Sequence, residues 1–169
     1  MVVANYPYPI TGGLEKQAHE LSKLLINKNI KTTILSGKFA PSQNRYELID
    51  NVPVHRLTWP ESRIIRYSIL PFRLLFFFLK NNNDFDIVHL HTLSWFSIYA
   101  LLVAKVFNKY TVLKLANVGE YGLTGLSNSF LGTLKLRIVK MSDTLVSMSH
   151  ISRQEAIDLA NASFVVNYS

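Results

Sequence analysis

Short apolar runs rich in β-branched residues alternate along this chain with longer segments of helical periodicity. Repeated strand–helix units of this length predict a parallel sheet covered by helices on both faces. We therefore expect one α/β, Rossmann-like domain over residues 1–169. The pattern predicts strands at 2–5, 31–36, 52–57, 86–91, 110–115 and 144–148, and helices at 14–28, 61–80, 94–107, 131–141 and beyond 152. The polar stretch 37–51 has no clear helical period, and Ser152 to Glu155 has the pattern of a capping box that opens the last helix.

The composition narrows the classes of function. The 169 residues contain no cysteine, which removes disulfides, thiolate nucleophiles and cysteine-based zinc sites. A net charge of +7 favours anionic partners such as phosphates, nucleotides or anionic lipid. The basic residues are scattered and no nucleic-acid reader motif is present, so no nucleic-acid partner is expected.

The two ends of the chain suggest a piece of a larger arrangement. Residues 2–5 have the pattern of the tail of a strand whose beginning is missing, and residues 164–169 contain no stop signal. We expect a second domain to follow where this sequence ends. No secretory signal is visible, so a cytoplasmic location is expected.

The segment from Ile64 to Leu79 is the most apolar stretch, but Arg66 and Arg73 interrupt it, so it is a poor transmembrane candidate. One interpretation is a basic, aromatic-rich helix lying on an anionic membrane surface, which would make the protein peripheral on the inner face of the membrane. The other is a core helix whose long basic side chains reach water. Three consecutive phenylalanines cannot all face one side, which favours the core helix.

Glycines mark two of the expected strand exits, where open parallel sheets bind ligands. Gly12 and Gly13 precede the first helix, and Gly119, Gly122 and Gly125 follow the strand at 110–115. Glycine permits positive φ and close backbone approach, and a helix N-terminus attracts phosphate. The first loop lacks the GxGxxG and P-loop patterns, so classical NAD or ATP binding is not supported. A plain glycine-rich helix start is the alternative.

Two histidines share one side of the strand at 86–91, because side chains alternate along a strand. His91 is expected at the end that faces the ligand cleft, and His89 deeper in the sheet. His91 is a candidate ligand contact, whereas His89 is better explained as a hydrogen-bonded structural histidine. A two-histidine metal site lacks a third ligand in the sequence, and no metal is expected.

Lys114 lies near the end of an otherwise apolar strand, where burial without a partner is costly. It is predicted either to reach a phosphate or carboxylate of a ligand or to pair with Glu120. Asn117 lies in the same loop, and Lys114, Asn117 and Glu120 together form a candidate substrate-binding cluster.

Three motifs occur in an order that resembles one enzyme family. Pro9-x-x-Gly12-Gly13-x-Glu15, Asp86-Ile87-Val88-His89-Leu90-His91 and the strand from Asp143 to Ser149 together resemble the retaining GT-B glycosyltransferases of family 4, the group 1 type. The motifs extend over almost the whole chain. The resemblance implies two Rossmann-like domains facing a cleft, of which this chain is the N-terminal, acceptor-side one. The C-terminal domain, which holds most of the nucleotide sugar, has no counterpart here.

The resemblance also implies residue roles. The glycine loop of the family approaches the donor diphosphate or an acceptor phosphate, and this role is carried onto Gly12 and Gly13, with Glu15 included in the substrate-binding set. Many members have a histidine after the fifth strand, where this chain has Ala116, so assistance from a histidine in that loop is not expected. No catalytic residue is assigned, and no cofactor is expected beyond the nucleotide sugar as co-substrate.

The expected function is transfer of a sugar from a nucleotide-sugar donor to a polysaccharide or glycolipid acceptor, with this half inactive unless the second domain is present. Two alternatives remain. The chain could be a non-catalytic acceptor-binding module, or an unrelated flavodoxin-like or nucleotide-binding α/β domain.

Overall fold

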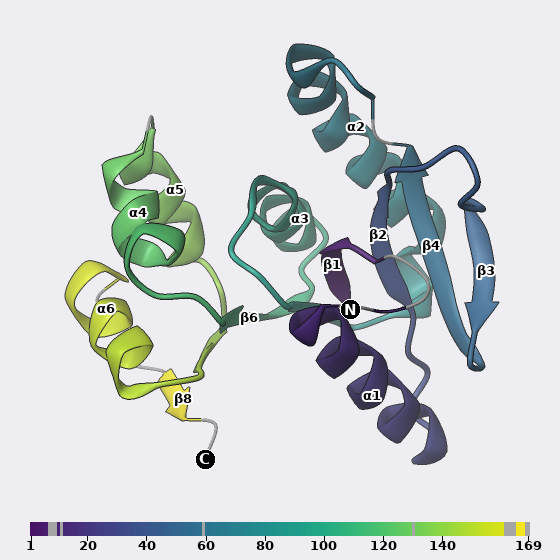
Figure 1. Ribbon diagram of the computed structural model, residues 1–169, viewed down its shortest axis with the longest axis horizontal. Coiled ribbons are helices and arrows are strands. Elements are labelled where there is room, and N and C mark those ends of the chain that lie inside the picture. The colour runs from purple at the N-terminus through teal and green to yellow at the C-terminus, as the bar shows by residue number, and fades with distance from the viewer. Residues whose placement is uncertain (7–9, 11, 59, 130, 161–164, 168–169) are drawn as a thin grey trace. The chain divides into compact units, whose positions relative to one another are not determined.

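The computed structural model describes residues 1–6, 10, 12–58, 60–129, 131–160 and 165–167 (Figure 1). The chain forms two compact units, Met1–Phe85 and Asp86–Ser169. Each unit combines a mostly parallel sheet with helices, so the predicted Rossmann-like α/β fold is confirmed. Among the described residues, no helix has both the length and the hydropathy needed to cross a bilayer.

The first unit contains four strands in the order β3-β4-β2-β1. The parallel strands are β1 (Val2–Asn5), β2 (Ile34–Lys38) and β4 (Val52–Thr58), and β3 (Tyr46–Ile49) runs antiparallel to β4. β3 lies in the stretch 37–51, to which the sequence pattern assigned no element. Asp50 and Asn51, with φ of 48° and 65°, form the two-residue turn from β3 to β4. Asp and Asn adopt such positive φ values more readily than most residues, which suits them to a tight hairpin.

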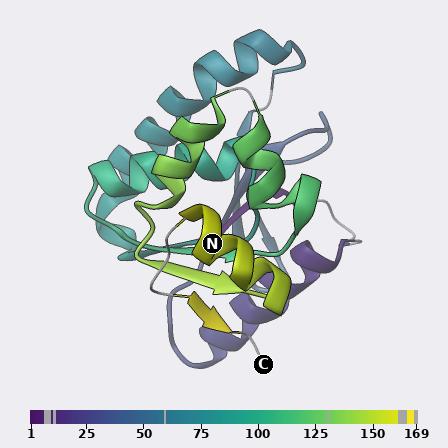
Figure 2. The same ribbon diagram turned by 90° about the vertical axis from the view of Figure 1, so that its left-hand side faces the viewer.

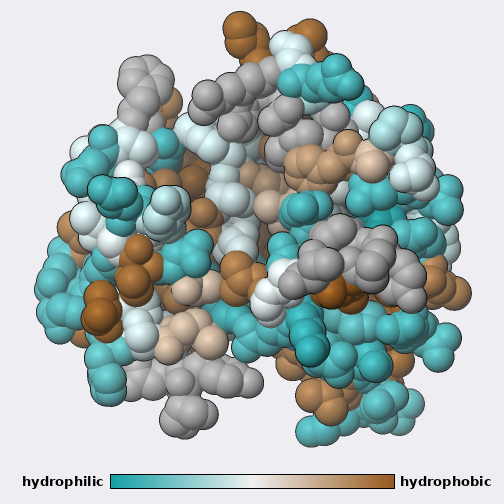
Figure 3. Space-filling view, in the orientation of Figure 1, coloured by the Kyte–Doolittle hydropathy of each residue, from teal (hydrophilic) through white to brown (hydrophobic). Residues whose placement is uncertain are grey.

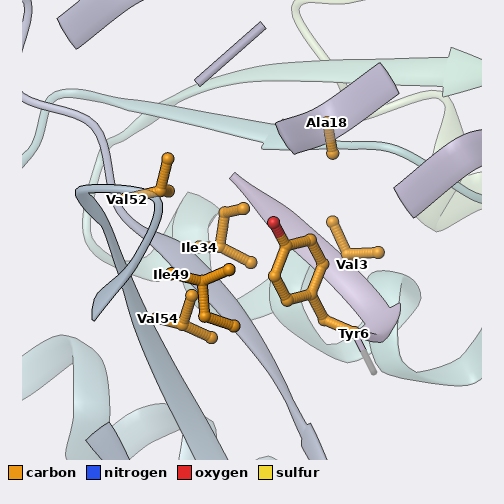
Figure 4. Packing of buried hydrophobic residues seen from close by; sticks show 7 residues of the cluster. All are labelled: Val3, Tyr6, Ala18, Ile34, Ile49, Val52 and Val54. Carbon is orange, nitrogen blue, oxygen red and sulfur yellow. The ribbon is translucent and has the colours of Figure 1, made fainter. Parts of the chain in front are cut away.

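Two long helices complete the first unit: α1 (Gly13–Asn27) and α2 (Arg63–Asn81), the latter followed by the short helix η1 (Asn82–Asp84). The core of the unit contains one aromatic and six aliphatic side chains, Val3, Tyr6, Ala18, Ile34, Ile49, Val52 and Val54 (Figure 4). α1 faces this core with Ala18, His19 and Ser22 rather than with a full leucine stripe, and Leu24 is 58% exposed. The expected apolar face of this helix is therefore only partly correct.

The second unit contains four parallel strands in the order β5-β6-β7-β8. They are β5 (Ile87–Leu90), β6 (Tyr110–Leu115), β7 (Thr144–Ser147) and β8 (Val165–Asn167). The helical elements are α3 (Trp95–Val106), η2 (Gly119–Tyr121), α4 (Leu123–Asn128), α5 (Gly132–Val139) and α6 (His150–Ala160). α3 packs on β5 and β6, and α6 packs on β7 and β8 beside α4 and α5 (Figure 2).

The last helix begins earlier than the sequence pattern indicated. The reciprocal cap is formed by Ser149 and Ser152: the Ser152 N–H donates to Ser149 Oγ at 3.1 Å, and the Ser149 N–H donates to Ser152 Oγ at 3.1 Å. The capping box predicted from Ser152 to Glu155 is therefore wrong by one turn. Glu155 therefore does not cap this helix, and its carboxylate contacts a different part of the unit.

Candidate functional site

The predicted site residues fall into two sets. Gly12, Gly13 and Glu15 lie at the start of α1 in the first unit. The second unit contains His91 after β5, Lys114 in β6, and Asn117 and Glu120 in the loop that follows. That the two sets form a single site stays a prediction.

Gly12 is the N-cap of α1, and its carbonyl accepts the Lys16 N–H at 2.9 Å. Its φ of −85° is available to any residue, so the backbone conformation does not require glycine here. A Cβ at Gly12 would lie 1.9 Å from Glu15 Oε2, so a larger residue would have to displace only the flexible end of the Glu15 side chain. The Glu15 carboxylate thus lies beside the N-cap, at the positive end of the helix dipole. At Gly13 a Cβ would meet nothing within 4 Å, and residues 7–9 and 11 of the predicted loop lie outside the described residues.

Tyr6, immediately before this loop, is held at both ends, a feature that sequence reasoning missed. Its hydroxyl lies 2.5 Å from His19 Nδ1, and His19 Nε2 lies 3.0 Å from Asp50 Oδ2. The Tyr6 carbonyl accepts from Arg56 Nη2 at 3.1 Å, and Arg56 also pairs with Glu47. Burial, and then the Asp50 charge, raise the pKa of the Tyr6 phenol. These contacts fix the point from which the glycine loop departs.

In the second unit, His89 and His91 lie on the same side of the chain, as predicted, with ring centroids 4.1 Å apart. The expectation that His89 lies deeper is wrong, because His91 is only 1% exposed and His89 is half-buried. Neither nitrogen of His91 has a hydrogen-bond partner among the described residues, and neither has His89 Nε2. His89 is therefore not held at Nε2 in the way expected of a structural histidine.

Lys114 is 3% exposed, and its Nζ has no hydrogen-bond partner in the described part of the chain. The predicted alternative, a pair with Glu120, is therefore not formed. β5 and β6 align Leu90 with Leu113, so His91 and Lys114 are the next neighbours in parallel register. Thr92 Oγ1, one residue further, is also buried without a partner among the described residues. Four neighbouring residues thus present unpaired buried polar atoms at the carboxyl ends of two adjacent strands.

Burial lowers the pKa of each titratable side chain at these strand ends, those of His89, His91 and Lys114. It is the main cause that lowers the pKa of His89 to about 4, with the Lys114 charge adding to it. Burial also lowers the pKa of His91 to about 2, helped by His89 and Lys114. Burial lowers the pKa of Lys114 as well. Both imidazoles are therefore neutral at physiological pH, and each can donate one hydrogen bond and accept another.

Comparison with known families decides where the chain belongs. The model of Glycosyltransferase Family 4 matches residues 11–165, nearly the whole chain. The chain belongs to Glycosyltransferase Family 4. This membership argues against the flavodoxin-like alternative. None of the curated proteins matches the chain.

Solved structures agree with the fold of a GT-B N-terminal domain. A sucrose-phosphate synthase from Thermosynechococcus elongatus matches with a TM-score of 0.66 and 16% identity, over 93% of this chain and 42% of that one. A second structure of the sucrose-phosphate synthase from the same organism matches with a TM-score of 0.60 and 14% identity, over 99% of this chain and 87% of that one. The family 4 chain thus spans less than half the length of the first of these.

The second glycine loop of this family 4 chain has structural reasons of its own for glycine, a positive φ at Gly119 and close packing at Gly125. Gly119 has a φ of +63°, and a Cβ at Gly125 would lie 1.8 Å from the Glu120 carbonyl oxygen. Glu155 Oε1 accepts from the Gly119 N–H and from Thr124 Oγ1, both at 2.7 Å. Asn117 and Glu120 are exposed on this braced loop. Their predicted substrate contacts stay predictions.

No group of three or more histidine, cysteine or acidic side chains among the described residues could hold a metal ion. The chemistry available at the strand ends is therefore hydrogen bonding and positive charge. Such a group suits an anionic ligand that brings several acceptor oxygens.

Proposed function

We propose that this family 4 chain is the acceptor-side, N-terminal half of a retaining glycosyltransferase that moves a sugar from a nucleotide-sugar donor to a polysaccharide or glycolipid acceptor. The second Rossmann-like domain would hold most of the donor, and this half alone would be inactive. We propose that the protein works in the cytoplasm, peripheral on the inner face of the membrane where a glycolipid acceptor would be reached. The membership in a glycosyltransferase family supports the sugar-transfer part of this proposal.

The observation that carries the proposal is the set of unpaired polar atoms around Lys114. A buried ammonium, two imidazole nitrogens of His91 and the Thr92 hydroxyl have no hydrogen-bond partner among the described residues. Leaving such groups unsatisfied costs about 1–3 kcal/mol each, and more for charged ones. A phosphate or sugar that supplies acceptors and a compensating negative charge would recover this cost, which is the behaviour expected of a substrate site.

The glycine loop, Lys114 and His91 would each have a role in the proposed reaction. In the retaining transfer the bond between the sugar and the diphosphate breaks while the acceptor oxygen attacks the same face, and the proton of the acceptor hydroxyl passes to the departing diphosphate oxygen. Negative charge then grows on the leaving diphosphate. Backbone N–H groups at Gly12 and Gly13 and the ammonium of Lys114 would stabilise that charge through fixed donors. His91 would orient a substrate hydroxyl as a neutral donor or acceptor.

The test is binding of nucleoside diphosphates to the intact protein by titration calorimetry, with uridine, guanosine and adenosine diphosphate as probes. Lys114→Met keeps most of the side-chain volume and removes the charge. We expect at least one of the three probes to bind, and its affinity to fall by about tenfold to a hundredfold in the variant, the range typical of a lost charged hydrogen bond. The free energy of unfolding should not fall, because the buried unpaired charge is removed as well.

Lys135→Met is the matched control. Lys135 is also buried in the second unit, but its Nζ donates to Ser129 Oγ at 2.6 Å and lies 4.2 Å from the centroid of the Trp95 ring. Its replacement should lower stability and leave diphosphate affinity unchanged. Equal affinity of Lys114→Met and the unmodified protein for every probe would remove Lys114 from the donor site. Acceptor binding without turnover of any nucleotide sugar, when a second, donor-binding domain is also present, would favour the non-catalytic module.

A further inference from the structure

α2 has two apolar faces, and only one of them is buried. Leu70, Leu74 and Phe78 are at most 2% exposed and follow one another at intervals of four residues. The opposite face consists of large apolar side chains that are 36–72% exposed, Ile65, Ile69, Phe72, Phe76 and Leu79. The sequence-based choice of a core helix therefore accounts for only half of α2.

The exposed face is a continuous stripe. Its members are spaced by four, three, four and three residues, which places them along one side of a helix. Ile64, 81% exposed, adds apolar surface in the same turn as Ile65, about 100° around the helix from it. Figure 3 shows hydrophobic side chains on the surface at the top of the view, over α2. Single exposed apolar residues are normal, but a contiguous apolar patch marks an interaction surface.

Basic positions accompany this stripe. Arg73 and Lys80 are seven residues apart, so they follow one line along the helix beside the stripe. Lys80 is exposed, and Arg73 donates from Nη1 to the Thr58 carbonyl at 2.9 Å. The helix sequence contains four basic residues and no acidic one.

We propose that α2 docks the protein onto an anionic phospholipid bilayer, lying flat with Phe72 and Phe76 among the acyl chains and the basic line among the headgroups. The buried face keeps the helix attached to its own unit, and no described helix is long and apolar enough to span a membrane. Apolar area and basic charge on one face together give interfacial binding.

Charge complementarity favours lipid over a second copy of this chain. Two α2 helices packed through their stripes would bring two basic lines together, and neither helix has an acidic residue to compensate them. Phospholipid headgroups supply the missing negative charge. Docking of α2 onto lipid does not depend on the sugar-transfer part of the proposed function. If the proposed function is also correct, the acceptor it takes is a lipid-linked one.

The test is co-sedimentation of the intact protein with vesicles of phosphatidylcholine, alone or mixed with phosphatidylglycerol. We expect binding to the mixed vesicles only, weakened by salt. The double variant Phe72→Ser/Phe76→Ser should lower the partition constant by about tenfold or more. Lys80→Glu should lower it by about fivefold or more. No donor or acceptor sugar is present, so a negative result would remove the membrane location from the proposed function and leave its sugar-transfer part untouched.

Matched controls come from the same unit. Leu48 on β3 is 62% exposed, and Lys31 is an exposed lysine outside α2. Leu48→Ser and Lys31→Glu should bind vesicles as the unmodified protein does. With mixed vesicles the emission of Phe76→Trp should shift to the blue relative to the unmodified protein, whose two tryptophans give the background, whereas that of Leu48→Trp should not.

Three results would overturn the proposal: no binding to the mixed vesicles, equal binding by the double phenylalanine variant, or an unshifted tryptophan at position 76. A dimer of the lipid-free protein that Phe72→Ser/Phe76→Ser dissociates, without vesicle binding, would assign the stripe to a second copy instead. Circular dichroism of each variant verifies that α2 and the sheet persist.

Discussion

At the scale of single residues, both histidines beside Lys114 have pKa values far below that of a free imidazole. Burial holds the pKa of His89 at about 4 and that of His91 lower still, whereas both would titrate near 6.5 in the unfolded chain. Between these values the unfolded state binds protons that the folded state does not. The free energy of unfolding therefore rises with pH across this window and falls on acidification.

We expect the stability of the protein to fall between pH 6.5 and about pH 4 by up to about 1.4 kcal/mol per pH unit for each histidine. Urea unfolding at a series of pH values measures this slope. In the double variant His89→Gln/His91→Gln the slope should be smaller, since neither glutamine titrates. The exposed His150, changed to Gln, is the control. An equal slope in the double variant would mean that the pair is protonated in the folded protein or accessible to water.

At the scale of elements, Asp143 joins three segments of the second unit. Its Oδ2 accepts from Lys105 Nζ at 2.5 Å, from the Thr111 N–H at 2.6 Å and from Thr111 Oγ1 at 2.7 Å. Burial alone would raise the pKa of this carboxyl, but the hydrogen bonds from Lys105 and Thr111 outweigh it and hold the pKa below its usual range. The residue that opens the third family motif thus ties α3 and β6 to the start of β7.

Asp143→Asn should lower the free energy of unfolding by about 1–3 kcal/mol, because it removes the charge from three hydrogen bonds at once. Chemical denaturation at neutral pH measures the loss. Asp158→Asn on α6 is the matched control: Asp158 is exposed and bonded only to Gln154 among the described contacts, so a change within about 0.5 kcal/mol is expected. If the two variants are equally stable, Asp143 does not join these segments in solution.

Local pattern predicted the parallel strands other than β8, and most helices, because their cause is local. β5 to β7 are short β-branched runs, and α3 is apolar nearly all round. β3 was missed because its four residues are mostly exposed, although Asp50 and Asn51 were an available turn signal. Ser152 with Glu155 fits the capping-box template and Ser149 with Ser152 does not, so the template indicated the wrong serine, and only the observed hydrogen bonds show that Ser149 is the capping residue.

At the scale of the whole molecule, the candidate site could be predicted where a charged residue interrupts an apolar strand. A lysine in an apolar strand signals an unpaired charge, and Lys114 is buried without a partner among the described residues. The bracing of Tyr6 was not predictable, because His19 and Arg56 lie 13 and 50 positions away and carry no local signal. The exposure of the α2 stripe likewise depends on which face of the helix the rest of the chain buries, which helical periodicity alone does not decide.

Whether the glycine loop and the Lys114 group serve one ligand is a question for the two units together. We expect a nucleoside diphosphate that binds to slow hydrogen exchange at residues 12–16 and at residues 91–94 and 115–118 in parallel, with one concentration dependence. The physical reason is that phosphate oxygens bound at the N–H groups of α1 and at Lys114 would suppress opening of the segments that carry these donors.

Exchange followed by mass spectrometry measures this, with Lys114→Met and Lys135→Met as the paired variants. The Lys114 change should reduce protection at both segments, because loss of one contact lowers the occupancy of the whole ligand. The Lys135 change should reduce neither. Protection confined to residues 12–16, or to the second unit, would mean that the two predicted sets belong to different sites, and the sugar-transfer geometry would then have to be built from one of them alone.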